Sequence, residues 1–275
     1  MLPITLKDKV IFITGAGGGI GRPTALLCAQ AGANVVCCEG PKGEAAGKET
    51  LNLLKEIGGK GIYLTCDLLN DESCKNTLDK AIQSCGKIDA VCYIAGVVST
   101  LGIDADISCD IEDPNYISTF VGQFDLHAGG PVRLMKYLIP QMIANGGGTF
   151  LTMSSIAAEL PAFGKIPYDA SKGAVTALAK SIACTYGDKG IVSIPIMPNR
   201  VGTKSALDRA NSSAQAAAEM GSTQLSNQMI TPEEVAKSFV YLLWNGRAHN
   251  GDPFYITDGA MSGLRPSTQA LLKLL

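Results

Sequence analysis

A tyrosine and a lysine four positions apart are the residues of this sequence best suited to proton transfer. Tyr168 and Lys172 open a stretch with helical periodicity, and a spacing of four places both side chains on one face of a helix. A phenol with a pKa of about 10 is a poor base at neutral pH, but a nearby ammonium favours the phenolate and lowers that pKa. The pair could exchange a proton with an alcohol or a carbonyl, although a surface pair without function has the same spacing.

A serine upstream of this pair could hold the oxygen of a substrate. Ser155 follows an apolar run, Phe150–Met153, which predicts a strand, and it lies 13 residues before Tyr168. Open parallel sheets bind ligands outside the carboxyl ends of their strands, so we expect Ser155 beside the start of the Tyr168 helix. A serine after a strand is also an ordinary turn residue, and the interpretation therefore depends on the combination.

A glycine-rich turn near the N-terminus has the composition of a dinucleotide site. The apolar run Val10–Ile13 predicts a buried strand, and an amphipathic helix is predicted from Ile20. Glycines between them allow a tight turn close to a pyrophosphate, and the helix N-terminus offers N–H groups to the phosphates. The spacing G-x-G-x-x-G is not met, whereas T-G-x-x-x-G-x-G fits from Thr14 to Gly21, with a plain turn as the alternative. The residues that we expect at the cofactor here are Gly15, Gly17, Gly19, Ile20 and Gly21.

Two acidic residues at the ends of later strands extend this candidate site. Glu39 lies 18 residues after Gly21, near the offset of about 20 at which a carboxylate accepts hydrogen bonds from an adenosine ribose. Because that carboxylate would repel the 2′-phosphate of NADP, we predict NAD as the cofactor. The alternative for Glu39 is an ordinary exposed loop acid. Asp67 could hydrogen-bond the adenine, with Leu68 beside it, or could cap its own turn.

The elements that must position these residues alternate along the chain. Strands are predicted at 10–13, 34–38, 61–66, 88–95, 149–154, 191–197 and 253–256, and helices at 20–31, 42–57, 71–85, 124–145, 168–187 and 231–244. The helix over 124–145 is expected to break near Gly129-Gly130-Pro131. Such alternation implies right-handed crossovers between parallel strands. We therefore predict an α/β fold, a single doubly wound parallel sheet of Rossmann type with helices on both faces, in one domain over residues 1–275.

Three segments interrupt this rhythm. Residues 97–123 form a long acidic connection, and residues 204–229, rich in Ala, Ser, Gln and Asn, are expected to be a substrate flap. Residues 265–275 are expected to be a C-terminal tail. Loops of this length are usually functional or disordered.

Composition argues against several classes of protein. The formal charge of -2 over 275 residues lacks the basic excess of a nucleic-acid binder. We expect no signal peptide and no membrane association, since no apolar run approaches the roughly 18 residues that span a bilayer. The nine cysteines form no C-x-x-C pair, so we expect no metal site and a reduced, cytoplasmic setting.

Together the motifs resemble the short-chain dehydrogenase/reductase family from about Lys7 to Met261. The resemblance implies that Ser155, Tyr168 and Lys172 are catalytic, and that Tyr168 and Lys172 also contact the cofactor. It implies further cofactor contacts at Ala95, Gly96, Pro198, Val201 and Thr203.

Two elements of the family pattern are altered in this chain. The family has two asparagines where this chain has Tyr93-Ile94, so only Ala95 and Gly96 carry over from that motif. The family's fourth catalytic residue, an asparagine 13 residues before a proline, corresponds to His127 when counted from Pro140. With a pKa near neutrality His127 could relay protons itself, or it could be a packed histidine.

The resemblance implies an NAD-dependent oxidoreductase that transfers a hydride between the nicotinamide and a secondary alcohol or its ketone, with Tyr168 as acid/base. The apolar residues between Ser155 and Tyr168 favour an apolar or cyclic small molecule as substrate. One alternative is an NAD-binding protein with little or no dehydrogenase activity. The other is a non-redox reaction, such as epimerisation or elimination, at the same residues. Because the family commonly forms tetramers, we expect a homo-oligomer, either a homotetramer or a dimer.

Overall fold

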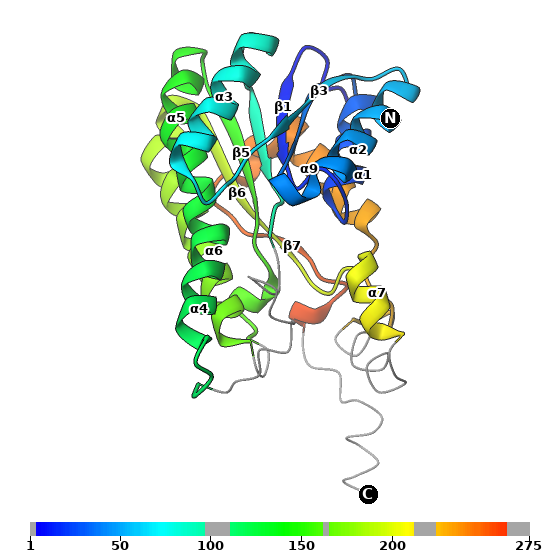
Figure 1. Cartoon of the computed structure of the whole chain (residues 1–275), viewed down its shortest axis with the longest axis vertical. Coiled ribbons are helices and arrows are strands. Elements are labelled where there is room, and N and C mark those ends of the chain that lie inside the picture. The colour runs from blue at the N-terminus through cyan, green and yellow to red at the C-terminus, as the bar shows by residue number, and fades with distance from the viewer. Residues whose placement is uncertain (1–3, 97–110, 162–164, 212–223, 263–275) are drawn as a thin grey trace, which may run out of the picture.

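The computed structural model describes residues 4–96, 111–161, 165–211 and 224–262. One sheet of seven parallel strands has the order β3-β2-β1-β4-β5-β6-β7 (Figure 1). The strands are β1 Val10–Thr14, β2 Asn34–Glu39, β3 Lys60–Thr65, β4 Ala90–Tyr93, β5 Gly148–Met153, β6 Ile191–Pro198 and β7 Phe254–Ile256. The helices are α1 Gly21–Gln30, α2 Glu44–Glu56, α3 Asp71–Cys85, α4 Tyr116–Phe124, α5 Gly130–Ala144, α6 Ile166–Tyr186, α7 Lys204–Ala210 and α9 Pro232–Asn245. The predicted fold class is confirmed.

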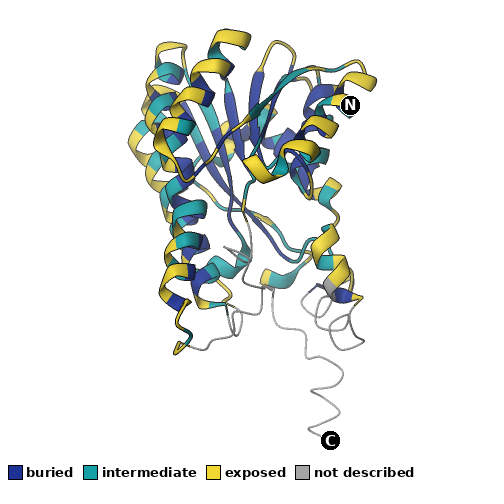
Figure 2. Cartoon of the chain, in the orientation of Figure 1, coloured by how far each residue is buried: buried dark blue, intermediate teal, exposed yellow. Residues whose placement is uncertain are grey.

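Alternating side chains of the strands build two hydrophobic cores, one on each face of the sheet. Ile11 and Ile13 of β1 pack on one face, in a cluster shared with α1, α2 and α9. Val10 and Phe12 point to the other face, in a cluster shared with α3 and α5. Both faces of a parallel sheet with crossover helices are covered in this way, and Figure 2 shows buried strands between the two helical layers.

The strand order reverses between β1 and β4. From β1 the chain proceeds through β2 to β3 on one side, and then returns to place β4 against β1, with Thr14 opposite Tyr93. In open α/β sheets ligands bind outside the carboxyl ends of the strands at such a switch point. The glycine-rich turn after β1 and the segment after β4 lie at this point.

The fourth strand is shorter than predicted. We expected residues 88–95, but β4 ends at Tyr93. The N–H groups of Ile94 and Ala95 both donate to Oγ1 of Thr14, at 3.1 Å each, instead of continuing the strand. The chain after β4 is thereby fixed to the end of β1.

The connection predicted over 97–123 was too long, since residues 116–123 belong to helix α4. The break predicted near Gly129-Gly130-Pro131 was also wrong. A π-helical turn, Asp125–Gly129, joins α4 to α5, and the N–H of Gly130 donates to the carbonyl of Asp125 five residues back. Residues 97–110 lie outside the described residues.

The segment predicted as a flap contains ordered structure at both ends. Its first residues form α7, and Gln224 near its end is buried, with its amide donating to the carbonyl of Arg200 at 2.8 Å. Residues 212–223 and the predicted tail, 265–275, lie outside the described residues. Within the part of the chain that is described, no helix has the length and apolarity needed to cross a membrane.

Candidate active site

The backbone of the glycine-rich turn has conformations and close contacts that a side chain would prevent. Gly15 and Gly19 have φ of 71° and 49°, which L side chains rarely adopt. A Cβ on Gly15 would lie 3.0 Å from the Cα of Ala95, and one on Gly21 would strike the carbonyl of Gly15. The turn therefore packs directly on the segment after β4. Ile20 precedes α1 and packs against the core, as a residue that anchors the turn.

Glu39 lies against this turn rather than in an exposed loop. Its Oε1 accepts the N–H of Gly17 at 2.6 Å, and its Oε2 accepts the N–H of Gly40 at 3.2 Å. Gly43 leaves room for the carboxylate, since a Cβ there would lie 2.6 Å from Oε2. Burial raises the pKa of Glu39, and the two backbone hydrogen bonds counteract part of that rise.

The segment after β6 approaches the turn from the other side. Pro198 is the last residue of β6, and Val201 pairs with Ile230 in a parallel bridge. Cγ2 of Thr203 lies 3.6 Å from the position of a Cβ on Gly19, while a Cβ on Gly18 would meet no atom within 4 Å. Backbone with open space in front of it suits a close approach by a pyrophosphate, so these residues fit a dinucleotide.

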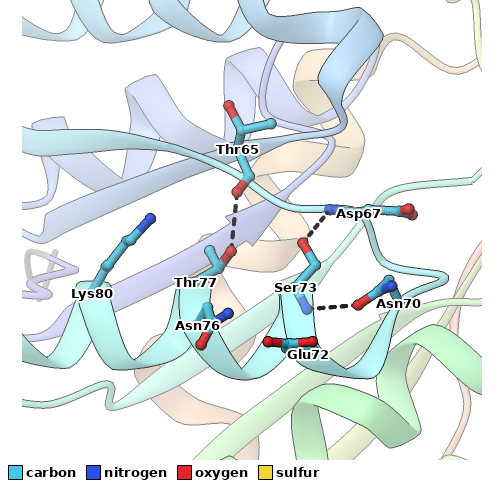
Figure 3. A pocket seen from close by; sticks show the side chains of 8 residues that line it. All are labelled: Thr65, Asp67, Asn70, Glu72, Ser73, Asn76, Thr77 and Lys80. Carbon is cyan, nitrogen blue, oxygen red and sulfur yellow. Dashed lines mark hydrogen bonds between the residues drawn. The ribbon is translucent and has the colours of Figure 1, made fainter.

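Asp67 and Leu68 follow β3, at the far end of this edge. Oδ1 of Asp67 accepts the N–H of Leu69 at 3.0 Å, which is the turn-capping role that we considered as the alternative. Leu68 is buried in the core between the sheet and α3. A cavity of about 390 Å³ lies beside them (Figure 3), lined by Thr65, Asp67, Asn70, Glu72, Ser73, Asn76, Thr77 and Lys80. None of the other predicted site residues lines it.

Ser155, Tyr168 and Lys172 meet at the carboxyl end of β5. Ser155 and Tyr168 share a side-chain hydrogen bond, and Oγ of Ser155 also accepts the N–H of Ala157 at 3.2 Å. Nζ of Lys172 lies 5.5 Å from the centre of the Tyr168 ring and donates to the carbonyl of Met153 at 2.9 Å. The sequence spacing therefore does bring the three side chains together.

Burial controls the ionisation of this pair. Lys172 is almost fully buried, and burial lowers its pKa to about 7. Burial raises the pKa of Tyr168, and the hydrogen bond with Ser155 offsets only part of that rise. Our expectation of a lowered tyrosine pKa was wrong for the chain alone, because the lysine binds a carbonyl and desolvation disfavours the phenolate.

His127 enters the same region from the π-helical turn. Its ring is buried, and it meets the Tyr168 ring edge-on at 5.8 Å between centroids. Nδ1 lies 2.8 Å from Oγ of Ser171, and that hydroxyl donates to the carbonyl of Tyr168 at 2.7 Å. Because the single hydroxyl hydrogen of Ser171 is used, Nδ1 carries the proton that it donates to Ser171.

Gly96 leaves open a space that both His127 and Lys172 border. A Cβ placed on Gly96 would lie 3.1 Å from Nε2 of His127 and 3.7 Å from Nζ of Lys172. The histidine is therefore packed, and its Nε2 and the lysine ammonium border the same space at Gly96.

Sequence reasoning missed two residues of this arrangement. Ser171 orients His127, and Tyr93 donates from its hydroxyl to the carbonyl of Leu126 at 2.6 Å. A serine three residues after Tyr168 was the signal available for the first, since it reaches the carbonyl one helical turn back. For the second, the signal was the presence of a tyrosine in place of an asparagine at the end of β4.

Three features lie at one edge of the parallel sheet, namely a glycine-rich turn, an acid after the second strand and a Ser-Tyr-Lys group. This arrangement is typical of α/β folds of the dehydrogenase class, which bind dinucleotides. The family profile of the short chain dehydrogenases matches residues 9–214. The chain belongs to that family.

Several relatives cover most of this chain. Cyclohexanol dehydrogenase of Acinetobacter sp. (strain SE19) is 28% identical over 92% of this chain and 95% of its own length. The 7alpha-hydroxysteroid dehydrogenase of Escherichia coli (strain K12) is 29% identical over 73% of this chain and 74% of its own. A solved structure of a 7 alpha-hydroxysteroid dehydrogenase complexed with NADH and 7-oxo glycochenodeoxycholic acid superposes with a TM-score of 0.83, at 24% identity, over 96% and 98% of the two chains. That last likeness shows the fold.

The described residues offer no cluster typical of a metal site. Across the described ranges, no three or more His, Cys, Asp or Glu side chains converge as metal ligands would.

Proposed function

We propose that this member of the family is an NAD-dependent oxidoreductase that transfers a hydride between the nicotinamide and a secondary alcohol or its ketone. The observation that carries the proposal is the meeting of Ser155, Tyr168 and Lys172 at the carboxyl end of β5, with Nζ of Lys172 5.5 Å from the centre of the tyrosine ring and bonded to the carbonyl of Met153. This group lies at the same sheet edge as the glycine-rich turn.

The nicotinamide cofactor, when bound, supplies or accepts the hydride. Tyr168 exchanges the proton with the substrate oxygen, and Ser155 orients that oxygen. Lys172 holds the nicotinamide ribose and favours the phenolate form of Tyr168 when it is charged. His127, whose Nε2 borders the same space at Gly96 as Nζ of Lys172, relays protons to the lysine. The residues after β1, β4 and β6 named above would hold the cofactor, and Asp67 and Leu68 lie at its adenine end.

Glu39 supports NAD rather than NADP. Its carboxylate is held against the glycine-rich turn by the N–H of Gly17. An acid in that position accepts hydrogen bonds from the ribose hydroxyls and repels a 2′-phosphate. Arg22, the nearest cation on α1, is paired with Glu49.

An apolar or cyclic alcohol is the substrate class that the chain and its relatives support. Exposed apolar side chains flank Ser155 and Tyr168 in the chain at Leu160 and Ile166, and others lie at Leu207, Leu225 and Met261. Exposed apolar side chains at a ligand site favour a ligand with little charge. The names of the relatives cited above include a cyclohexanol and a hydroxysteroid, both cyclic alcohols.

We also propose a homo-oligomer, a tetramer or a dimer, in the cytoplasm. Ile117, Val121 and Phe124 are exposed along one side of α4, and a second copy of the chain would cover them. The described cysteines are free thiols, as expected in a reducing compartment.

Replacing Tyr168 tests the activity. We expect Tyr168→Phe to bind NADH with a dissociation constant within about twofold of the wild type, because the phenol is not needed for dinucleotide binding. We expect its turnover of a cyclohexanol and hydroxysteroid panel to fall by about 10³-fold or more, because the acid/base is gone. Absorbance at the NADH band measures turnover, and NADH fluorescence measures binding.

Tyr186→Phe, at the opposite end of the same helix, is the matched control. Retained turnover in Tyr168→Phe would contradict the proposal. A wild type that binds NADH without oxidising or reducing any member of the panel would support the binding-only alternative. Conversion of a substrate with no net change in NADH would support a non-redox reaction.

A further inference from the structure

The π-helical turn Asp125–Gly129 leaves one carbonyl without its usual partner on the helix. The N–H of Gly130 donates to the carbonyl of Asp125, five residues back. The next residue, Pro131, has no N–H to offer. The carbonyl of Leu126 therefore lacks the donor that a regular helix would supply four or five residues later.

Tyr93 supplies that donor from the end of β4. Its hydroxyl donates to the carbonyl of Leu126 at 2.6 Å, and its ring is buried between the sheet and α5. A Cβ on Gly130 would collide with this hydroxyl, so the glycine is required for the contact. Tyr93, Gly130 and Pro131 thus act together to form and cap the π-helical turn.

The capped carbonyl is adjacent to His127. Residues of an α-helix follow one another at about 100° around the axis, so conversion of the π-helical turn to regular helix would rotate His127 away from its present direction. In that direction Nδ1 reaches Ser171 at 2.8 Å, and Nε2 lies 3.1 Å from the position of a Cβ on Gly96. A Leu126 carbonyl without the Tyr93 hydroxyl would favour such a rearrangement, because the carbonyl would lose its hydrogen bond.

We propose that Tyr93 is a positioning residue, which acts through the π-helical turn to hold the imidazole of His127 on Ser171 and at the space beside Gly96 that Lys172 also borders. This proposal rests on the proposed function, in which His127 relays protons to Lys172. The proposal links two departures from the family pattern, because Tyr93 at the end of β4 positions His127 in the π-helical turn that follows.

The activity test is a double-mutant cycle between Tyr93 and His127. We expect Tyr93→Phe to lower kcat about tenfold, to leave KM and NADH affinity within about twofold, and to shift the pH profile of kcat. In a His127→Ala background we expect Tyr93→Phe to change kcat by less than about twofold, because its effect passes through the histidine. An equal tenfold loss in both backgrounds would overturn the proposal.

A second readout needs no turnover. The chain has two histidines, so the imidazole ¹⁵N spectrum of the protein is simple, and His249→Asn assigns it. We expect His127 to show the Nδ1-protonated tautomer, and Tyr93→Phe to shift its signals without moving those of His249. Unchanged His127 signals in Tyr93→Phe would overturn the proposal even in a protein without measurable dehydrogenase activity.

Two further variants complete the test. Tyr137→Phe removes an exposed hydroxyl on α5, which bonds Asp71 at 2.7 Å, and we expect it to leave kcat and the His127 signals unchanged. Gly130→Ala displaces the Tyr93 hydroxyl from its carbonyl without changing the tyrosine. We expect it to shift the His127 signals as Tyr93→Phe does, so it carries the test if Tyr93→Phe does not fold, and unchanged signals would overturn the proposal there too.

Discussion

At the scale of single residues, burial away from water determines the pKa values of the candidate catalytic side chains. Lys172 has the carbonyl of Met153 as its hydrogen-bond partner and a pKa lowered to about 7 by burial. Near neutral pH the lysine can therefore gain or lose a proton, which suits a group in a proton-transfer chain. Tyr168, whose pKa burial raises from its ordinary value of 10.0, stays protonated near neutral pH in the chain alone.

The lowered lysine pKa should make stability depend on pH. In the unfolded chain Lys172 titrates at the ordinary lysine pKa of 10.5, so between pH 7 and 10.5 the unfolded chain binds more protons than the folded chain. The free energy of unfolding should therefore rise with pH in this window, by about 2 kcal/mol from pH 7 to pH 9 from this group. In Lys172→Met we expect this part of the rise to disappear, which urea titrations at the two pH values would measure.

The buried cysteines contribute to the pH dependence of both proteins. The difference between the wild type and Lys172→Met therefore isolates the contribution of the lysine. Lys180→Met, an exposed position on the same helix, is the control and should keep the rise. A wild type and a Lys172→Met variant with parallel pH dependence would show that the lysine remains charged in the folded protein.

Glu39 determines a second residue-scale prediction, on the choice of cofactor. Glu39→Gln keeps an acceptor for the N–H of Gly17 and removes the charge that would oppose a 2′-phosphate. We expect the ratio of kcat/KM for NADP to that for NAD to rise at least about tenfold, equivalent to 1.4 kcal/mol. Steady-state rates with both cofactors measure the ratio.

Glu44→Gln provides the matched control, since Glu44 is an exposed acid on α2 that pairs with Lys48. It should leave the cofactor ratio unchanged. A wild type that prefers NADP, or an unchanged ratio in Glu39→Gln, would mean that the carboxylate does not face the ribose.

At the scale of elements, the sequence predicted best where apolar residues face the core. Helix α3 has the predicted bounds, Asp71–Cys85, and its buried positions include Leu78 and Ala81. Helix α4 was missed because its pattern is reversed. Thr119 and Gln123 face inward, whereas Ile117 and Val121 are exposed. Periodicity that assumes an apolar inner face cannot identify such a helix.

The π-helical turn shows a second reason why local prediction failed. Gly129-Gly130-Pro131 contains two residue types that disfavour helix and was predicted as a break. The helix continues because the N–H of Gly130 bonds Asp125 and the hydroxyl of Tyr93 caps Leu126. The second contact spans 33 positions. A window of neighbouring residues contains no information about a partner that the sheet supplies.

Some contacts of the candidate site were predictable from local sequence, whereas others depend on distant elements. The spacing of Tyr168 and Lys172 specified their proximity, since one helix carries both. The approach of Glu39 to Gly17 was predictable from the offset between strand ends. The space at Gly96 that Nε2 of His127 and Nζ of Lys172 both border depends on three elements, which are α6, the π-helical turn and the segment after β4. Contacts that need several elements could be proposed from the family resemblance but not calculated from local pattern.

At the scale of the whole molecule, the sheet joins the two halves of the chain into one structure. Strand β1 pairs with β4, and β4 pairs with β5. Helix α9, near the C-terminus, packs with α1, near the N-terminus, in one hydrophobic cluster that includes Ala25 and Phe239. The proposed catalytic group, in the second half, can therefore meet a cofactor at the glycine-rich turn proposed as its site in the first.

This arrangement predicts a single cooperative unfolding transition, as the proposed single domain requires. Trp244, the one tryptophan of the chain, lies on α9, so its fluorescence reports the second half while far-UV circular dichroism reports all helices and strands. We expect the two urea midpoints to coincide, because α9 cannot leave without exposing the core that it shares with α1. NADH at about a hundredfold above its dissociation constant should shift both midpoints together, by about 2.7 kcal/mol of added stability. A tryptophan transition that precedes the circular dichroism transition, or an NADH shift in only one of them, would instead indicate two separately folding units with the cofactor bound to one.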